Sequence, residues 1–160
     1  MRRLLPLLAI AVLSGQAVAG GKLPPAAPQD IAAVQACLSS RQAMQQASCI
    51  GAAADMCLKT ADSQQRMTNC MVRERAVWDL FLNNDYPEVM KGLRPEAQRE
   101  LLEVERQFVA NTERRCTFIR KAAGYSSYIQ VVEIEECMMH ATAVQWLWLR
   151  DFLPEREKQR

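Results

Sequence analysis

Apolar residues recur at intervals of three and four positions from residue 29 almost to the end of the chain. This spacing is typical of helices that bury one face, because residues three and four apart lie on the same side of an α-helix. No run of alternating β-branched residues bounded by turn signals interrupts it, so strands are not expected. The pattern predicts about five helices, near residues 30–38, 41–59, 63–86, 95–123 and 126–153. The expected fold class is therefore all-α, a single helical bundle with antiparallel hairpins.

Prolines and a glycine mark several of the predicted helix ends. Pro87 should end or kink the third helix, because a proline removes one backbone hydrogen bond and clashes with the preceding turn. Pro95 suits the first turn of the fourth helix, and Gly124 suits the left-handed position just past its end. Asp30 is a plausible N-cap for the first helix.

The first residues have the pattern of a secretory signal peptide. Met1–Arg3 is cationic, Leu4–Leu13 is an apolar run, and Ala17–Ala19 forms a small-residue cleavage site. We expect residues 1–19 to be removed and the mature protein to reach an oxidising compartment. The apolar run is too short to span a bilayer, and no later stretch approaches the roughly 20 apolar residues that a membrane helix needs. No membrane insertion of the mature chain is therefore expected.

The rest of the chain divides by composition. Residues 20–28 contain three prolines and no apolar periodicity, which predicts an extended tether. Residues 29–62 form a cysteine-containing helical extension, residues 63–153 the main helical domain, and residues 154–160 a polar tail. A mature chain of about 140 residues fits one domain with a modest core.

The charge of the mature chain excludes one class of partner. The full sequence has 20 Lys and Arg residues, and loss of Arg2 and Arg3 leaves 18 against 18 Asp and Glu residues. The mature protein is formally neutral. Proteins that bind nucleic acids normally carry a strong basic excess, so no nucleic acid is expected as a partner.

Six cysteines behind a secretory signal predict disulfides formed in an oxidising compartment. Cys116 lies about seven residues before the end of the fourth helix, and Cys137 about nine residues after the start of the fifth. These near-equal offsets place the two cysteines at the same height in an antiparallel helix pair, so we expect them to be bonded.

The four N-terminal cysteines are harder to pair. Cys49 and Cys57 would be roughly 12 Å apart on one predicted helix, which is beyond the reach of a disulfide. Pairing across the turn near residue 62 favours Cys57 with Cys70, and this leaves Cys37 with Cys49. Six cysteines allow 15 pairings, so other pairings of these four stay open.

The sequence gives little reason to expect catalysis, a cofactor or a metal. His140 is the only histidine, and it lies on an apolar helix without a serine or cysteine nucleophile motif. No two cysteines have the two-to-four-residue spacing of a zinc site, and no glycine pattern could cradle a phosphate. Glu133, Glu135 and Glu136 could be imagined as catalytic carboxylates, but they make the first turn of the fifth helix acidic, where the helix dipole favours negative charge. We expect a non-enzymatic protein.

The cysteines stand in a pattern of polar and aromatic residues. The first element has a cysteine, an acidic residue, a tryptophan, a Leu-Asn pair and a tyrosine, here Cys70, Glu74, Trp78, Leu82, Asn83 and Tyr86. The second corresponds to Glu105, Arg106, Phe108, Thr112, Glu113 and Cys116. The third corresponds to Cys137 and Thr142. The pattern resembles the LprI-like lysozyme inhibitor domain family over about residues 70–149, which makes 63–153 the LprI-like domain. Phe108 replaces the family's tryptophan, Glu105 its glutamine and Thr112 its arginine.

The resemblance implies a helical periplasmic protein that binds another protein, with lysozyme or another envelope glycosidase as the candidate partner. Asn83 and Asn84, next to Pro87, are candidates for the partner surface. Trp78, Leu82, Tyr86 and Phe108 are expected in the core.

The alternative function is an envelope structural or adaptor protein without inhibitory activity. The stretch 144–153 is apolar most of the way round, and Trp146 and Trp148 cannot point the same way on one helix. Whichever of the two is exposed would form the docking surface of such an adaptor.

Overall fold

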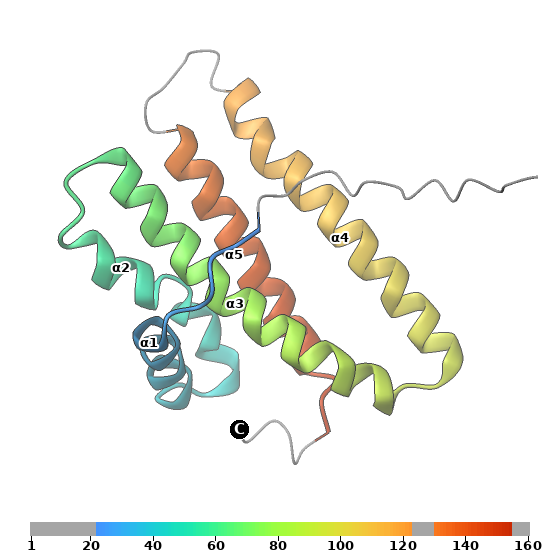
Figure 1. Ribbon diagram of the computed structural model, residues 1–160. Helices are drawn as coiled ribbons and strands as arrows, with labels where there is room; N and C mark the ends of the chain where they lie inside the picture. The colour runs from blue at the N-terminus through green and yellow to red at the C-terminus, as the bar shows by residue number, and fades with distance from the viewer. Residues whose placement is uncertain (1–21, 123–129, 155–160) are drawn as a thin grey trace, which may run out of the picture.

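The computed structural model of the chain describes residues 22–122 and 130–154 (Figure 1). Within these ranges the chain is helical and contains no strand, so the all-α prediction is confirmed. The elements are α1 (Pro28–Ser39), the 3₁₀ helix η1 (Ala43–Cys49), α2 (Ala52–Leu58), α3 (Gln64–Gly92), α4 (Pro95–Ala122) and α5 (Gln130–Arg150). The expected signal peptide, the Gly124 turn and most of the polar tail lie outside the described residues.

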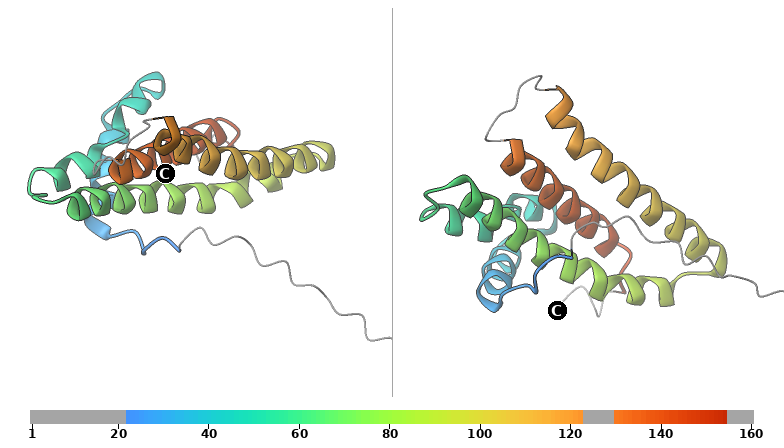
Figure 2. Two further views of the ribbon diagram at one scale, coloured as in Figure 1. Left: turned by 90° about the horizontal axis from the view of Figure 1, so that it is seen from above. Right: turned by 45° about the horizontal axis from the view of Figure 1, so that its top comes forward.

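The long helices form the main body of the molecule. Figure 1 shows α5 running between α3 and α4, and α3 packs on α5 over the most extensive interface. α4 runs antiparallel to α5 and packs on it, whereas α1 and α2 pack on the N-terminal part of α3. Figure 2 shows α1, η1 and α2 gathered at one end of the long-helix layer. No described helix is long and apolar enough to cross a membrane.

The main core lies where α1 and α2 meet α3 and α5. Trp78 and Val77 of α3 are fully buried there, together with Val34 of α1 and Ala143 of α5. The Trp78 and Trp146 rings lie 5.4 Å apart, and Trp146 Nε1 donates a 2.7 Å hydrogen bond to Asp85 Oδ2. Trp146 is therefore anchored inside the bundle by both its ring and its polar atom.

The prediction of a single helix over 41–59 is wrong, because this stretch is divided at Ile50–Gly51 into η1 and α2. Gly51 has φ 104°, a left-handed conformation that favours glycine. The carboxylate of Glu74, itself 0 % exposed, accepts hydrogen bonds from the backbone N–H groups of Gly51, Ala53 and Ala54 at 2.6–2.8 Å. It also accepts one from Trp78 Nε1 at 2.9 Å. Glu74 thus satisfies the otherwise unpaired donors at the start of α2.

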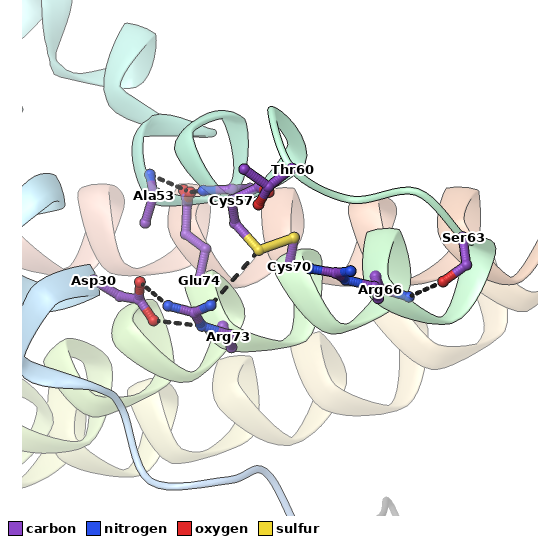
Figure 3. Close-up of a disulfide and its surroundings, with 10 residues drawn as sticks. Asp30, Ala53, Cys57, Thr60, Ser63, Arg66, Cys70, Arg73 and Glu74 are labelled. Atoms are coloured by element: carbon purple, nitrogen blue, oxygen red, sulfur yellow. Dashed lines mark hydrogen bonds and ion pairs between the residues drawn. A yellow bond between two sulfur atoms is a disulfide. The ribbon is translucent and has the colours of Figure 1, made fainter.

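Three disulfides join Cys37 to Cys49, Cys57 to Cys70 and Cys116 to Cys137, with Cα–Cα distances of 5.5–5.6 Å. These are the three pairs expected from the sequence. The second bond ties α2 to α3, and Figure 3 shows Arg73 beside it. Arg73 Nε and Nη2 donate to the two carboxylate oxygens of Asp30 at 2.9 and 2.7 Å, which adds α1 to the same cluster.

Helix α3 does not end at Pro87 but continues to Gly92. The last turns bury Val89, which is 1 % exposed, against Leu101, Leu149 and Leu153 in a second apolar cluster. Burial of these residues offsets the one hydrogen bond that the proline removes.

Candidate functional site

A partly open groove of about 570 Å³ lies between α3 and α4 and is lined on one side by α5. We call it the groove. The α3 residues that line it are Arg75, Asp79, Leu82, Asn83 and Tyr86. Their spacing places them on one face of α3, on the side turned toward α4. α3 and α4 diverge from their connection at Leu93–Arg94, so neither helix covers the lining face of the other.

The α4 side of the groove is apolar and acidic. Leu102 and Val109 line it and are 41 % and 65 % exposed, while Phe108 lies half-buried between α4 and its neighbours. Glu105 and Glu113 stand among them. Exposed apolar side chains that gather around one groove can contact a partner.

An ion pair closes one end of the groove. Arg75 Nη1 of α3 donates to Glu135 Oε2 of α5 at 2.7 Å, and the two side chains are 19 % and 24 % exposed. Glu135, one of the three glutamates considered for catalysis, is therefore engaged by an arginine. The groove lining holds four carboxylates, on Asp79, Glu105, Glu113 and Glu135, against the one guanidinium of Arg75.

Two of these carboxylates are held in half-buried positions by neutral amides. Asn83 Nδ2 donates to Asp79 Oδ2 at 3.0 Å, and Gln145 Nε2 donates to Glu105 Oε1 at 2.7 Å. Burial raises the pKa of Asp79, and the Arg75 charge and the Asn83 hydrogen bond only partly oppose it. Burial likewise raises the pKa of Glu105. The lining of the groove thus carries more carboxylates than cationic groups to compensate them.

The described residues offer neither a metal site nor a free thiol. Within the described ranges no group of three or more His, Cys, Asp or Glu residues could hold a metal ion. His140 is exposed and does not line the groove. All six cysteines are in disulfides, so no thiol is available as a nucleophile.

The resemblance motif comes together at the groove. Its members Leu82, Asn83, Tyr86, Phe108 and Thr142 come from three helices and all line it. The expectation that Leu82, Tyr86 and Phe108 are core is therefore wrong in part, because they are only half-buried and form its walls. Trp78 is core, as expected.

Other candidates lie elsewhere. Arg106 is turned away from the groove, and its 68 % exposed side chain has only a loose 3.9 Å ion pair with Glu103. Asn84 is exposed but does not line the groove. Trp146 is 5 % exposed and can offer no partner surface, whereas Trp148 is 39 % exposed and contacts the ring of Phe152 at 5.1 Å.

Sequence reasoning missed six groove residues, which are Leu23, Arg75, Asp79, Leu102, Val109 and Met138. A signal was present for two of them, because Arg75 and Asp79 precede Asn83 at intervals of four and share its helix face. Leu23 belongs to the segment expected to be a tether, and nothing local shows that it lies at a groove.

A sequence model of one protein family, described as Lysozyme inhibitor LprI, matches residues 57–149, more than half of the chain. The match runs from the second disulfide to the end of α5 and includes all of α3 and α4. No curated protein and no solved structure matches the chain. Apart from Leu23, every residue that lines the groove lies within the matched span.

Proposed function

Since the chain belongs to the LprI lysozyme inhibitor family, we propose that it is a non-enzymatic inhibitor that binds a lysozyme-type glycosidase in the periplasm through the groove. One observation carries the proposal: motif residues that are far apart in the sequence, from Leu82 to Thr142, converge on this one surface. Core packing alone does not require Tyr86 and Phe108 to stay half-buried beside the carboxylates of Asp79 and Glu105.

The scaffold favours such a role because the groove is formed before a partner arrives. Cys116–Cys137 holds α4 on α5 at one end, and the short Leu93–Arg94 connection holds α4 near α3 at the other. A rigid surface loses little conformational entropy on binding, which raises affinity. Disulfides that persist in an oxidising compartment also agree with action in the cell envelope.

The test is inhibition of lysozyme-catalysed cell-wall clearance by the oxidised protein, at low and physiological salt, against goose-, chicken- and invertebrate-type enzymes. We expect saturable, stoichiometric inhibition of at least one type. Val109→Arg should weaken it at least about tenfold, because a long charged side chain would fill the groove. Phe118→Arg is the matched control: Phe118 is 61 % exposed on the same helix but does not line the groove, and its variant should stay within about twofold. Lack of inhibition across the panel at high excess would refute the proposal.

The exposed aromatic pair Trp148 and Phe152 supports the second candidate function, an envelope adaptor that inhibits nothing. In that case Trp148→Ala should reduce capture of partners from periplasmic extract, and Val109→Arg should leave capture unchanged. Both variants should keep wild-type helical content by circular dichroism. If Val109→Arg reduces capture and Trp148→Ala leaves it unchanged, the adaptor function is excluded.

A further inference from the structure

The segment between residue 22 and α1 is held along the bundle at two points. Leu23 lines the groove, and Ala26 packs against the main core. Pro24 and Pro25 favour a polyproline II conformation, which has three residues per turn. Leu23 and Ala26 therefore face the same side, toward the protein, while Lys22 is exposed directly beside Leu23.

We propose that the groove binds an extended peptide segment of its protein partner in which a basic side chain adjoins an apolar one, and that Leu23 of this chain, with Lys22 exposed beside it, occupies part of the groove in its place. The inference rests on the proposed function, because it concerns the same site and names the chemistry of the partner segment. The inference goes beyond the family by giving the partner segment a competitor within the same chain, the segment around Leu23.

The basic part of this specificity follows from the charges that line the groove. Arg75 pairs with Glu135 and only partly offsets the charge of Asp79, so carboxylates still outnumber cations in the groove lining. Asp79 and Glu105 receive only neutral amide donors from Asn83 and Gln145. An ammonium or guanidinium group that reached either carboxylate would form charge-assisted hydrogen bonds, which are roughly twice as strong as neutral ones.

The apolar part follows from the walls. Tyr86 and Phe108 offer ring faces, and Leu102 and Val109 offer exposed aliphatic surface. The aliphatic stem of a lysine or arginine can pack on such surface while its charged end reaches a carboxylate. Leu23 lines the groove, so a leucine side chain from an extended segment can be accommodated there.

The intramolecular segment should compete weakly. A tethered ligand acts at an effective concentration in the millimolar range, so it reduces the affinity for an outside segment without preventing binding.

Two acetylated and amidated peptides probe the groove, Lys-Leu-Pro-Pro-Ala and its charge-reversed match Glu-Leu-Pro-Pro-Ala. Each is titrated into the isotope-labelled, oxidised full chain, and amide shifts are followed by NMR. In the Leu23→Ser protein, which frees the end of the groove, we expect the lysine peptide to shift the signals of Tyr86, Phe108 and Thr142. It should bind there at least about threefold more tightly than to the wild type. The glutamate peptide should bind at least about tenfold more weakly.

Two double variants distinguish the effect of the groove carboxylates on peptide binding from the effect of net charge. In the Leu23→Ser background, Asp79→Asn with Glu105→Gln should weaken binding of the lysine peptide at least about fivefold. Glu100→Gln with Glu103→Gln removes the same charge from exposed positions outside the groove and should change binding less than about twofold.

Equal binding of the two peptides, absence of groove shifts in the Leu23→Ser protein, or equal affinity of that protein and the wild type would overturn the inference. The two proposals fail separately. Peptide binding without inhibition of any lysozyme refutes only the proposed function, and inhibition without peptide binding refutes only this inference.

Discussion

Glu74 and Asp79 lie little more than one turn apart on α3, yet their carboxylates have opposite surroundings. Glu74 is fully buried and accepts four hydrogen bonds, three from the start of α2 and one from Trp78. Asp79 is half-buried at the groove and receives one side-chain amide. The first has donors for both of its oxygens, whereas the second has a raised pKa because burial is not matched by donors.

The difference separates a part of the protein built for stability from a part available for binding. At the closed end, disulfides, the Asp30–Arg73 pair and the Glu74 contacts lock α1, η1 and α2 onto α3. At the open end, α3 and α4 diverge and expose charge and apolar surface to solvent. Residues that lower stability without forming compensating contacts are typical of functional sites.

The largest expected effect is at the closed end. Glu74→Ala should lower the free energy of unfolding by about 3–5 kcal/mol, because it leaves several buried N–H groups without an acceptor. Chemical denaturation of the oxidised protein measures it. Glu74→Gln, which keeps one carbonyl oxygen, should lose less, and Glu105→Gln is the control at the groove. A loss below about 1 kcal/mol for Glu74→Ala would show that the closed end does not depend on this carboxylate.

Removing the Cys116–Cys137 disulfide should affect the open end selectively. Replacing both cysteines by serine should cost around 3 kcal/mol for a loop of this length and should allow α4 to separate from α5. Hydrogen exchange would then rise in α4 and α5 more than in α1 and α2. Inhibition, if present in the wild type, should fall with it. Uniformly faster exchange throughout the chain would contradict this division into two regions.

The smallest effect concerns pH. In the folded protein the pKa values of Asp79 and Glu105 are raised above their ordinary values of 3.8 and 4.5. At a pH between the ordinary pKa and the raised pKa, the folded state therefore binds more protons than the unfolded state. These two groups therefore stabilise the fold less as the pH rises through that window. The free energy of unfolding of the wild type, minus that of the Asp79→Asn, Glu105→Gln protein, should fall over this range by under about 1 kcal/mol.

Affinity for a basic peptide should change in the opposite direction over the same window. Both carboxylates must be ionised to attract a cation, so binding should strengthen as the pH rises.

For the stability prediction, denaturation is measured at matched salt. A difference in the free energy of unfolding between the wild type and the double variant that increases with pH would contradict the assigned cause of the pKa shifts.

Much of the fold could be predicted because it depends on local chemistry. Pro95 begins α4 as expected, and equal offsets along neighbouring helices were enough to pair Cys116 with Cys137. The break at Gly51 could not be foreseen from propensity, because the alanines around it favour a continuous helix. It depends on Glu74, which reaches α2 from another helix. The continuation of α3 past Pro87 likewise depends on burial of Val89 by distant residues.

The sequence by itself determined the helical class, the presence of the long helices α3, α4 and α5 and the residues of the motif, because periodicity, capping and covalent pairing act over short distances along the chain. Only the tertiary structure decided which side of each helix is covered. It placed Trp146 inside and Trp148 outside, and it left Leu82, Tyr86 and Phe108 around a groove instead of in the core. A helix face is buried or exposed according to what packs against it, and that partner comes from a distant part of the chain.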